Sequence, residues 1–157
     1  MAEDVPQSWR DPSSFGGTTS TWHQFRLQVP SLIQESQFHA VLDLGCRNGA
    51  LTQILLDQGL RVVSADLTPA SFEVPGQTSI GSDLNAPLPF RDSVFDAIAC
   101  VETIEHVENP HLLIREVNRN LRLQGRFFNH AQYPFPLVPD ELLASRISQP
   151  ISFNERS

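Results

Sequence analysis

The sequence predicts an α/β fold built on a doubly wound, mostly parallel sheet of about five strands, with helices on both faces. Three observations support this prediction. Short apolar segments typical of buried strands alternate with amphipathic segments typical of helices. A glycine turn at residues 45–49 joins the first of these strands directly to a helix. Acidic residues follow successive strands, at the ends where such sheets bind their ligands.

The first strand, residues 40–44, is apolar except for Asp43. A parallel strand covered on both faces is expected to be apolar throughout, so Asp43 needs an explanation. The helix that follows the glycine turn repeats apolar residues at spacings of three and four, and Gly59 suits the left-handed position that ends a helix. A strand that runs through a glycine turn into a helix N-terminus indicates a cradle for a nucleotide-like ligand.

Four more strands are expected, at residues 60–65, 79–84, 96–101 and 126–129, the second of them weak. A helix is expected from Pro110 to Gly125, because proline favours a first turn and apolar residues then fall on one stripe. Prolines between the second and third strands limit that connection to one turn of helix. Further helical segments are expected at residues 21–33 and 140–148.

The chain of 157 residues has the length of one domain, which we place at residues 21–157, after a flexible lead-in at residues 1–20. A net charge of −7 argues against a general basic surface for nucleic acid. No apolar run approaches the ~20 residues that span a bilayer, so we expect a soluble, cytoplasmic protein. Cys46 and Cys100 form no CxxC pair, and we expect both to be small buried residues.

The second strand ends at Asp66, roughly 20 residues beyond the glycine turn, where a carboxylate can accept hydrogen bonds from ribose hydroxyls. This position predicts a nucleoside ligand. A dinucleotide fingerprint, G-x-G-x-x-G/A, would require a glycine at position 47, but the residues there are Gly45, Arg47 and Ala50. A nicotinamide oxidoreductase is therefore disfavoured.

The segment Val-Leu-Asp-Leu-Gly-Cys at residues 41–46, followed by Gly49, resembles the first motif of class I S-adenosylmethionine-dependent methyltransferases of the methyltransferase type 11-like group. The resemblance continues in the right order over roughly residues 38–130. Its later motifs are Asp66, Asp83-Leu84, Leu88-Pro89-Phe90, Phe95-Asp96, Glu102-x-x-Glu105-His106 and Asn109-Pro110. It implies a Rossmann-like fold, S-adenosylmethionine as methyl donor, and transfer to an oxygen, nitrogen or carbon of a small-molecule acceptor.

The resemblance also implies a set of donor-binding residues. They are Asp43, Gly45, Cys46, Arg47, Gly49, Asp66, Leu67, Asp83, Leu84 and Val101. Asp43 would hold the amino group of the methionine part, Asp66 the ribose hydroxyls, and Asp83 the adenine amino group. Carboxylates suit a ligand that carries positive charge better than a nest of N–H groups that binds phosphate.

The acceptor must lose a proton, and Glu102 and His106 are the catalytic candidates for that step. On a helical turn Glu102, Glu105 and His106 would point the same way. Some relatives that carry E-x-x-E-H, among them RNA 2′-O-methyltransferases and quinone-biosynthesis O-methyltransferases, hold a divalent ion there, and His130 could add a ligand. Two alternatives remain: His106 as a general base or acceptor contact, and a solvated loop whose histidine packs against the next helix.

Two departures from the family limit the functional prediction. Arg47 replaces a usual glycine, at a cost of about 1 kcal/mol if its backbone is left-handed, and would either block the pocket or pair with the donor carboxylate. Only 29 residues follow Phe128, so we expect the C-terminal antiparallel hairpin of the family to be missing and the fifth strand to lie at an edge open to a second copy or a partner. The chain would then be a truncated product, a domain completed by a partner or dimer, or a degenerate member of the family. The alternative to an enzyme is a non-catalytic or degenerate donor-binding subunit.

Overall fold

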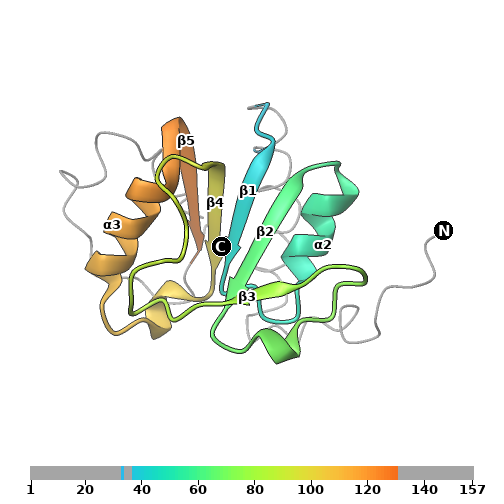
Figure 1. Ribbon diagram of the computed structural model, residues 1–157, viewed down its shortest axis with the longest axis horizontal. Helices are drawn as coiled ribbons and strands as arrows, with labels where there is room; N and C mark the ends of the chain where they lie inside the picture. Colours follow the sequence, from blue (N-terminus) through green and yellow to red (C-terminus); the bar gives the residue numbers. More distant parts are fainter. Residues whose placement is uncertain (1–32, 34–36, 131–157) are drawn as a thin grey trace, which may run out of the picture.

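The computed structural model describes residue 33 and residues 37–130 of the chain. Its sheet has the order β3-β2-β1-β4-β5, with every neighbouring pair parallel (Figure 1). The strands are β1 (Ala40–Leu44), β2 (Arg61–Asp66), β3 (Ser79–Gly81), β4 (Phe95–Val101) and β5 (Leu121–His130). The chain adds strands outward from β1 to β3 and then returns to the other side of β1, which confirms the predicted doubly wound sheet.

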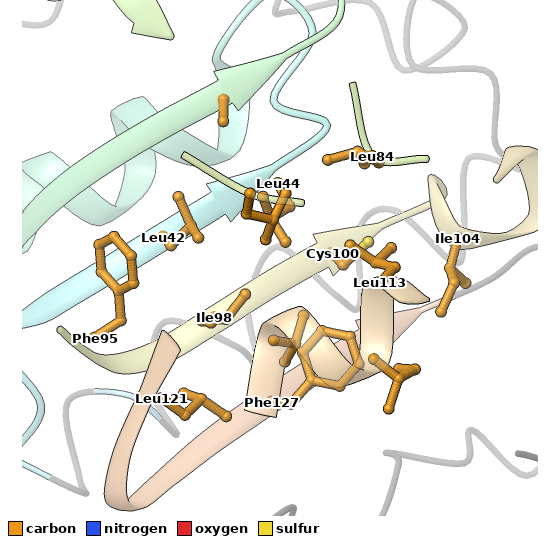
Figure 2. Packing of buried hydrophobic residues seen from close by; sticks show 14 residues of the cluster. Leu42, Leu44, Leu84, Phe95, Ile98, Cys100, Ile104, Leu113, Leu121 and Phe127 are labelled. Atoms are coloured by element: carbon orange, nitrogen blue, oxygen red, sulfur yellow. The ribbon is translucent and has the colours of Figure 1, made fainter. Parts of the chain in front are cut away.

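The helices α2 and α3 cover opposite faces of the sheet. The helix α2 (Ala50–Asp57) packs with Val41 on one face, and α3 (Pro110–Asn120) packs with Leu42 and Leu44 on the other. Successive residues of a strand point to opposite faces, so one short strand supplies both cores. Figure 2 shows the cluster on the α3 side, and its fully buried members include Ile98 and Leu113.

The predicted end of the second helix at Gly125 is wrong. The helix α3 stops at Asn120, and the fully buried Leu121 already belongs to β5, where it pairs with Phe95. The register then shifts before Ala97 pairs with Arg126, so the residues between form a bulge. A Cβ at Gly125 would lie 2.9 Å from a backbone oxygen, which explains the glycine.

Several predicted features lie outside the described residues: the lead-in at 1–20, most of the helical segment at 21–33, the helix at 140–148 and the expected lack of a C-terminal hairpin. Within the described part, β5 is one edge of the sheet, as expected. The same part contains no helix that is long and apolar enough to span a membrane.

The C-terminal end of α3 holds the loop that precedes β4. Arg119 donates to the carbonyl oxygens of Leu88 and Phe90 at 3.0 and 2.7 Å and to the carboxylate of Asp92 at 2.8 Å. The neighbouring Glu116 accepts from the backbone N–H of Leu88 at 2.8 Å and also pairs with Arg119. One arginine therefore satisfies two backbone carbonyls that the loop itself does not pair.

This network predicts that Arg119→Ala lowers the free energy of unfolding by about 2 kcal/mol, because two carbonyls lose charged donors. Arg115→Ala, an exposed change in the same helix, should cost much less. Urea unfolding of both variants measures the difference. Equal losses would show that the loop does not depend on Arg119.

Candidate functional site

The glycine turn after β1 is tied to the end of β2. The N–H groups of Gly45 and Cys46 donate to the carbonyl oxygen of Ala65 at 2.8 and 3.2 Å. Gly45 and Gly49 have φ values of 71° and 90°, which side chains disfavour. A Cβ on Gly45 would lie 2.3 Å from the Thr103 hydroxyl oxygen, so the turn and its neighbours fit together only without a side chain there.

Arg47 occupies the middle of this turn with a left-handed backbone at φ 51°, as the sequence led us to consider. The conformation costs about 1 kcal/mol for a residue with a side chain. Its N–H donates to Asp66 Oδ2 at 2.9 Å, while Asp66 Oδ1 accepts from the N–H of Thr68 at 2.8 Å. The predicted ribose carboxylate therefore also holds the glycine turn in place.

Asp43 is buried, with 2% of its surface exposed. Its Oδ2 accepts a hydrogen bond of 2.7 Å from the Thr52 hydroxyl, which lies 2.8 Å from the hydroxyl of Ser64. Burial raises the pKa of Asp43 to about 6; the hydrogen bond from Thr52 opposes this rise, and the nearby charge of Asp66 adds to it. The anomalous acid of β1 thus has a hydrogen-bond partner inside the fold, the Thr52 hydroxyl.

Two adjoining hollows lie at this end of the sheet. The first is lined by Asp43, Gly45, Cys46, Arg47, Asn48, Ala50, Leu51, Val101 and Glu102. The second encloses about 300 Å³ and is lined by Gly45, Arg47, Asp66, Glu102, Thr103 and His106. Because Arg47 and Glu102 line both, the two hollows form one cleft, which we call the strand-end cleft.

The strand-end cleft brings together most of the predicted residues near the glycine turn with both catalytic candidates. Five predicted residues are not among its lining residues: Gly49, Leu67, Asp83, Leu84 and Glu105. Leu67 is 71% exposed next to Asp66. Asp83 Oδ1 accepts from the N–H of Asn85 at 2.9 Å, so this acid forms a turn as well as being a predicted adenine contact.

Residues 102–106 do not form the helical turn that would place their side chains on one side. Glu102 has a left-handed backbone at φ 47°, and the following 3₁₀ turn, η4, covers only Ile104–His106. Burial and the charge of Glu105 raise the pKa of Glu102, against the influence of Arg47 and His106. Among the described residues, no three His, Cys, Asp or Glu side chains are grouped to hold a metal ion. The last residue of β5, His130, is in register with Val101.

The two cysteines are buried, as expected. Cys46 lies in the glycine turn with its sulfur 3.3 Å from the hydroxyl of Ser79. Burial raises the pKa of its thiol to about 12 and raises that of Cys100 as well. Neither thiol is suited to act as a nucleophile near neutral pH.

Residues 42–129 match the family described as a methyltransferase domain. The chain belongs to this family. The predicted family is confirmed, and with it the prediction of S-adenosylmethionine rather than a dinucleotide as the ligand of this family.

Two curated relatives of this methyltransferase domain carry the name ubiquinone biosynthesis O-methyltransferase. The protein from Xylella fastidiosa (strain M23) is 33% identical over 129 residues, covering 76% of this chain and 52% of the relative. The protein from Histophilus somni (strain 2336) is 29% identical over 146 residues, covering 80% and 59%. The chain therefore spans a little over half the length of these relatives.

Solved structures support the fold. The PH0226 protein from Pyrococcus horikoshii is 25% identical, with a TM-score of 0.58 over 78% of this chain and 60% of that one. A putative methyltransferase of Haloferax volcanii, solved in a complex with the Trm112 methyltransferase activator, has a TM-score of 0.54 at 21% identity, over 76% and 56% of the two chains, and supports the fold alone.

The structure adds residues that the sequence analysis missed. Thr52 donates a hydrogen bond to Asp43, and Ser64 bonds to Thr52. Asn48 and Thr103 line the strand-end cleft. Thr52 and Ser64 each interrupt an otherwise apolar buried segment, as Asp43 does. A search for polar residues on the buried faces of predicted elements could have found both.

The burial of Asp43 predicts a pH-dependent stability. Its pKa rises from 3.8 to about 6 on folding, so its contribution to stability is complete below pH ~4 and is lost as pH rises through about 6. Asp43→Asn removes this titration. We therefore expect the variant to gain stability relative to wild type between pH ~4 and ~7, by at most roughly 3 kcal/mol.

Urea unfolding at several pH values measures this gain, with Asp57→Asn, an exposed acid at the end of α2, as the control. A difference between Asp43→Asn and wild type that does not vary with pH would contradict the assigned burial.

Proposed function

We propose that this chain is a methyltransferase domain that binds S-adenosylmethionine in the strand-end cleft and transfers its methyl group to an oxygen of a small molecule. The observation that supports this most strongly is the pair of carboxylates, Asp43 and Asp66, on either side of one glycine turn. Two acids separated by a turn of backbone N–H groups suit a ligand with an ammonium group and a ribose. The bound sulfonium would supply an activated methyl group, so positioning can provide much of the rate.

In this proposal Asp43 binds the ammonium group of the donor and Asp66 its ribose hydroxyls. Each Asp66 oxygen already accepts one backbone N–H and has a second lone pair for the ligand. The exposed Leu67 covers one side of the nucleoside, while Asp83 and the backbone of Leu84 meet the adenine. Gly45, Cys46 and Val101 line the wall beside the methionine part, and Gly49 lets the backbone of the turn approach it.

Arg47 is proposed to bind the donor carboxylate. A guanidinium pairs with a carboxylate through two parallel hydrogen bonds, and this side chain lines both parts of the cleft. Its left-handed backbone is held by the N–H bond to Asp66. The strain is tolerable if the side chain contributes to binding.

Glu102 and His106 are proposed to take the proton of the acceptor hydroxyl. Both line the larger hollow, which also contains Asp66. The raised pKa of Glu102 brings a carboxylate closer to the range useful for a general base. The oxygen acceptor is favoured because the named relatives are O-methyltransferases. A metal ion held by Glu102, Glu105 and His106 is not part of this proposal, because these three side chains are not grouped as ligands.

The edge position of β5 favours an assembly role beside catalysis. Its outer side is open in the described sheet, and a second copy or a partner chain could pair along it. We propose the cytoplasm as the location, since the acidic chain shows no apolar run long enough to span a bilayer.

The donor site predicts measurable binding of S-adenosylhomocysteine, which keeps the ammonium, carboxylate and nucleoside groups. Asp66→Asn should weaken binding at least about tenfold, because it removes a charge-assisted acceptor for the ribose hydroxyls. Isothermal calorimetry at pH 7.5 measures this, with Asp57→Asn as the control. Wild-type protein that gives neither heat nor a thermal shift at millimolar ligand would remove the proposal.

The assignment of Arg47 predicts that Arg47→Ala and Arg47→Gly both lower the affinity for S-adenosylhomocysteine about tenfold. Gly also relieves the left-handed backbone, so it should be the more stable of the two variants by about 1 kcal/mol. Calorimetry and urea unfolding give the two quantities. Tighter binding by Arg47→Gly would mean instead that the arginine obstructs the cleft.

A further inference from the structure

Three polar side chains form a hydrogen-bonded chain in the interior, between β1, β2 and α2. Asp43 and Ser64 are partners in the parallel register, so their side chains stand on the same face of the sheet. Thr52 comes down onto that face from α2 and lies between them, 2.7 Å from Asp43 Oδ2 and 2.8 Å from the hydroxyl of Ser64. We call these three residues the polar relay.

We propose that Thr52 and Ser64 are positioning residues that keep Asp43 ionised and hold it facing the ammonium group of the bound methyl donor. This inference rests on the proposed function, and it adds to the donor site two residues that do not line the cleft. Neither residue would touch the ligand. Their effect reaches the ligand through the carboxylate.

Burial makes the polar relay a specific arrangement. Asp43, Thr52 and Ser64 are only 2%, 1% and 3% exposed. The residues around them on this face include the buried Val41 and Leu51. Polar groups in such surroundings lower stability unless they are hydrogen-bonded. Each of these three side chains has a hydrogen-bond partner among the other two, so the group is stable only as a set.

The hydrogen bonds have one direction when Asp43 is ionised. A hydroxyl has a single proton, and Thr52 donates its proton to Asp43 Oδ2. Ser64 must then donate to the Thr52 oxygen. Two aligned hydroxyl dipoles point toward the carboxylate, and each strengthens the other. Asp43 also lines the cleft, so the residue that Thr52 holds from the interior borders the proposed donor site.

The other charged and titratable groups around Asp43 do not replace the relay. Asp66 and burial both favour the protonated acid, and the hydrogen bond from Thr52 opposes them. The thiols of Cys46 and Cys100 remain neutral because burial raises their pKa. Arg47 and Glu102 line the same cleft with opposite charges, and the single titratable residue of α2, Asp57, is at its exposed end. Without Thr52 the pKa of Asp43 would move closer to neutrality, and a neutral acid attracts an ammonium group weakly.

The test is the pH dependence of S-adenosylhomocysteine binding to the full chain, measured by calorimetry between pH 5 and 8. In wild type the affinity should fall as Asp43 takes up its proton near pH 6. Thr52→Val, which removes the hydroxyl at nearly constant shape, should move the midpoint of this fall upward by about one pH unit. Ser64→Ala should move it in the same direction by less. The double variant should match Thr52→Val alone, because Ser64 acts through Thr52.

Two control variants separate positioning from loss of stability. Thr52→Ser keeps the hydroxyl and should keep the wild-type midpoint. Val41→Ala, in the same buried cluster, should lower the unfolding midpoint and leave the pH profile unchanged. An unchanged pH midpoint in folded Thr52→Val would overturn the proposal.

A second readout keeps this inference distinct from the proposed function. The carboxyl carbon of Asp43, followed by NMR in isotope-labelled protein without ligand, reports its titration directly. An upward shift in Thr52→Val together with absent ligand binding in wild type would refute the donor site alone. No shift in Thr52→Val would refute the relay whether or not the ligand binds.

Discussion

The attachment of the glycine turn to the end of β2 is the contact on which the rest of the site depends. Gly45 and Cys46 donate to the carbonyl oxygen of Ala65, and Arg47 donates to the carboxylate of Asp66. These bonds fix the start of α2 relative to β2 without any ligand. The ammonium and ribose ends of a donor would therefore meet two acids whose separation is set by the backbone. The same bonds hold Arg47 in a left-handed backbone conformation, which is unfavourable for a residue with a side chain.

The alternation of side chains along β1 places one acid where an apolar residue is expected. Val41 serves the α2 face, while Leu42 and Leu44 serve the α3 face. Asp43 has the same parity as Val41, so it must lie under α2, where water cannot satisfy it. The hydroxyl of Thr52 supplies the missing partner. An acid buried in a strand thus needs a hydrogen-bonding partner, and here the covering helix provides a hydroxyl.

Local patterns predicted the parts of the site that depend on one segment. The strand, glycine turn and helix around Asp43, and the position of Asp66, follow from periodicity and turn chemistry. The end of α3 was predicted wrongly at Gly125. Glycine is common both after a helix and in a β-bulge, and Gly125 lies in the bulge of β5 opposite β4. The contacts of Thr52 and Ser64 with Asp43 and with each other were not predicted. They depend on how β1, β2 and α2 are placed side by side, and the pattern of one segment does not contain this information.

Arg47 and Glu102 both have left-handed backbones at the strand-end cleft and bring opposite charges to it. Both residues line the two hollows, and the positive charge of Arg47 opposes the rise that burial and Glu105 cause in the pKa of Glu102. In the proposed complex Arg47 would pair with the donor carboxylate, and the sulfonium of the donor would bring a positive charge of its own into the cleft. The donor would therefore exchange positive charge in the cleft rather than remove it, and burial would remain the cause that raises the pKa of Glu102 toward the range of a general base.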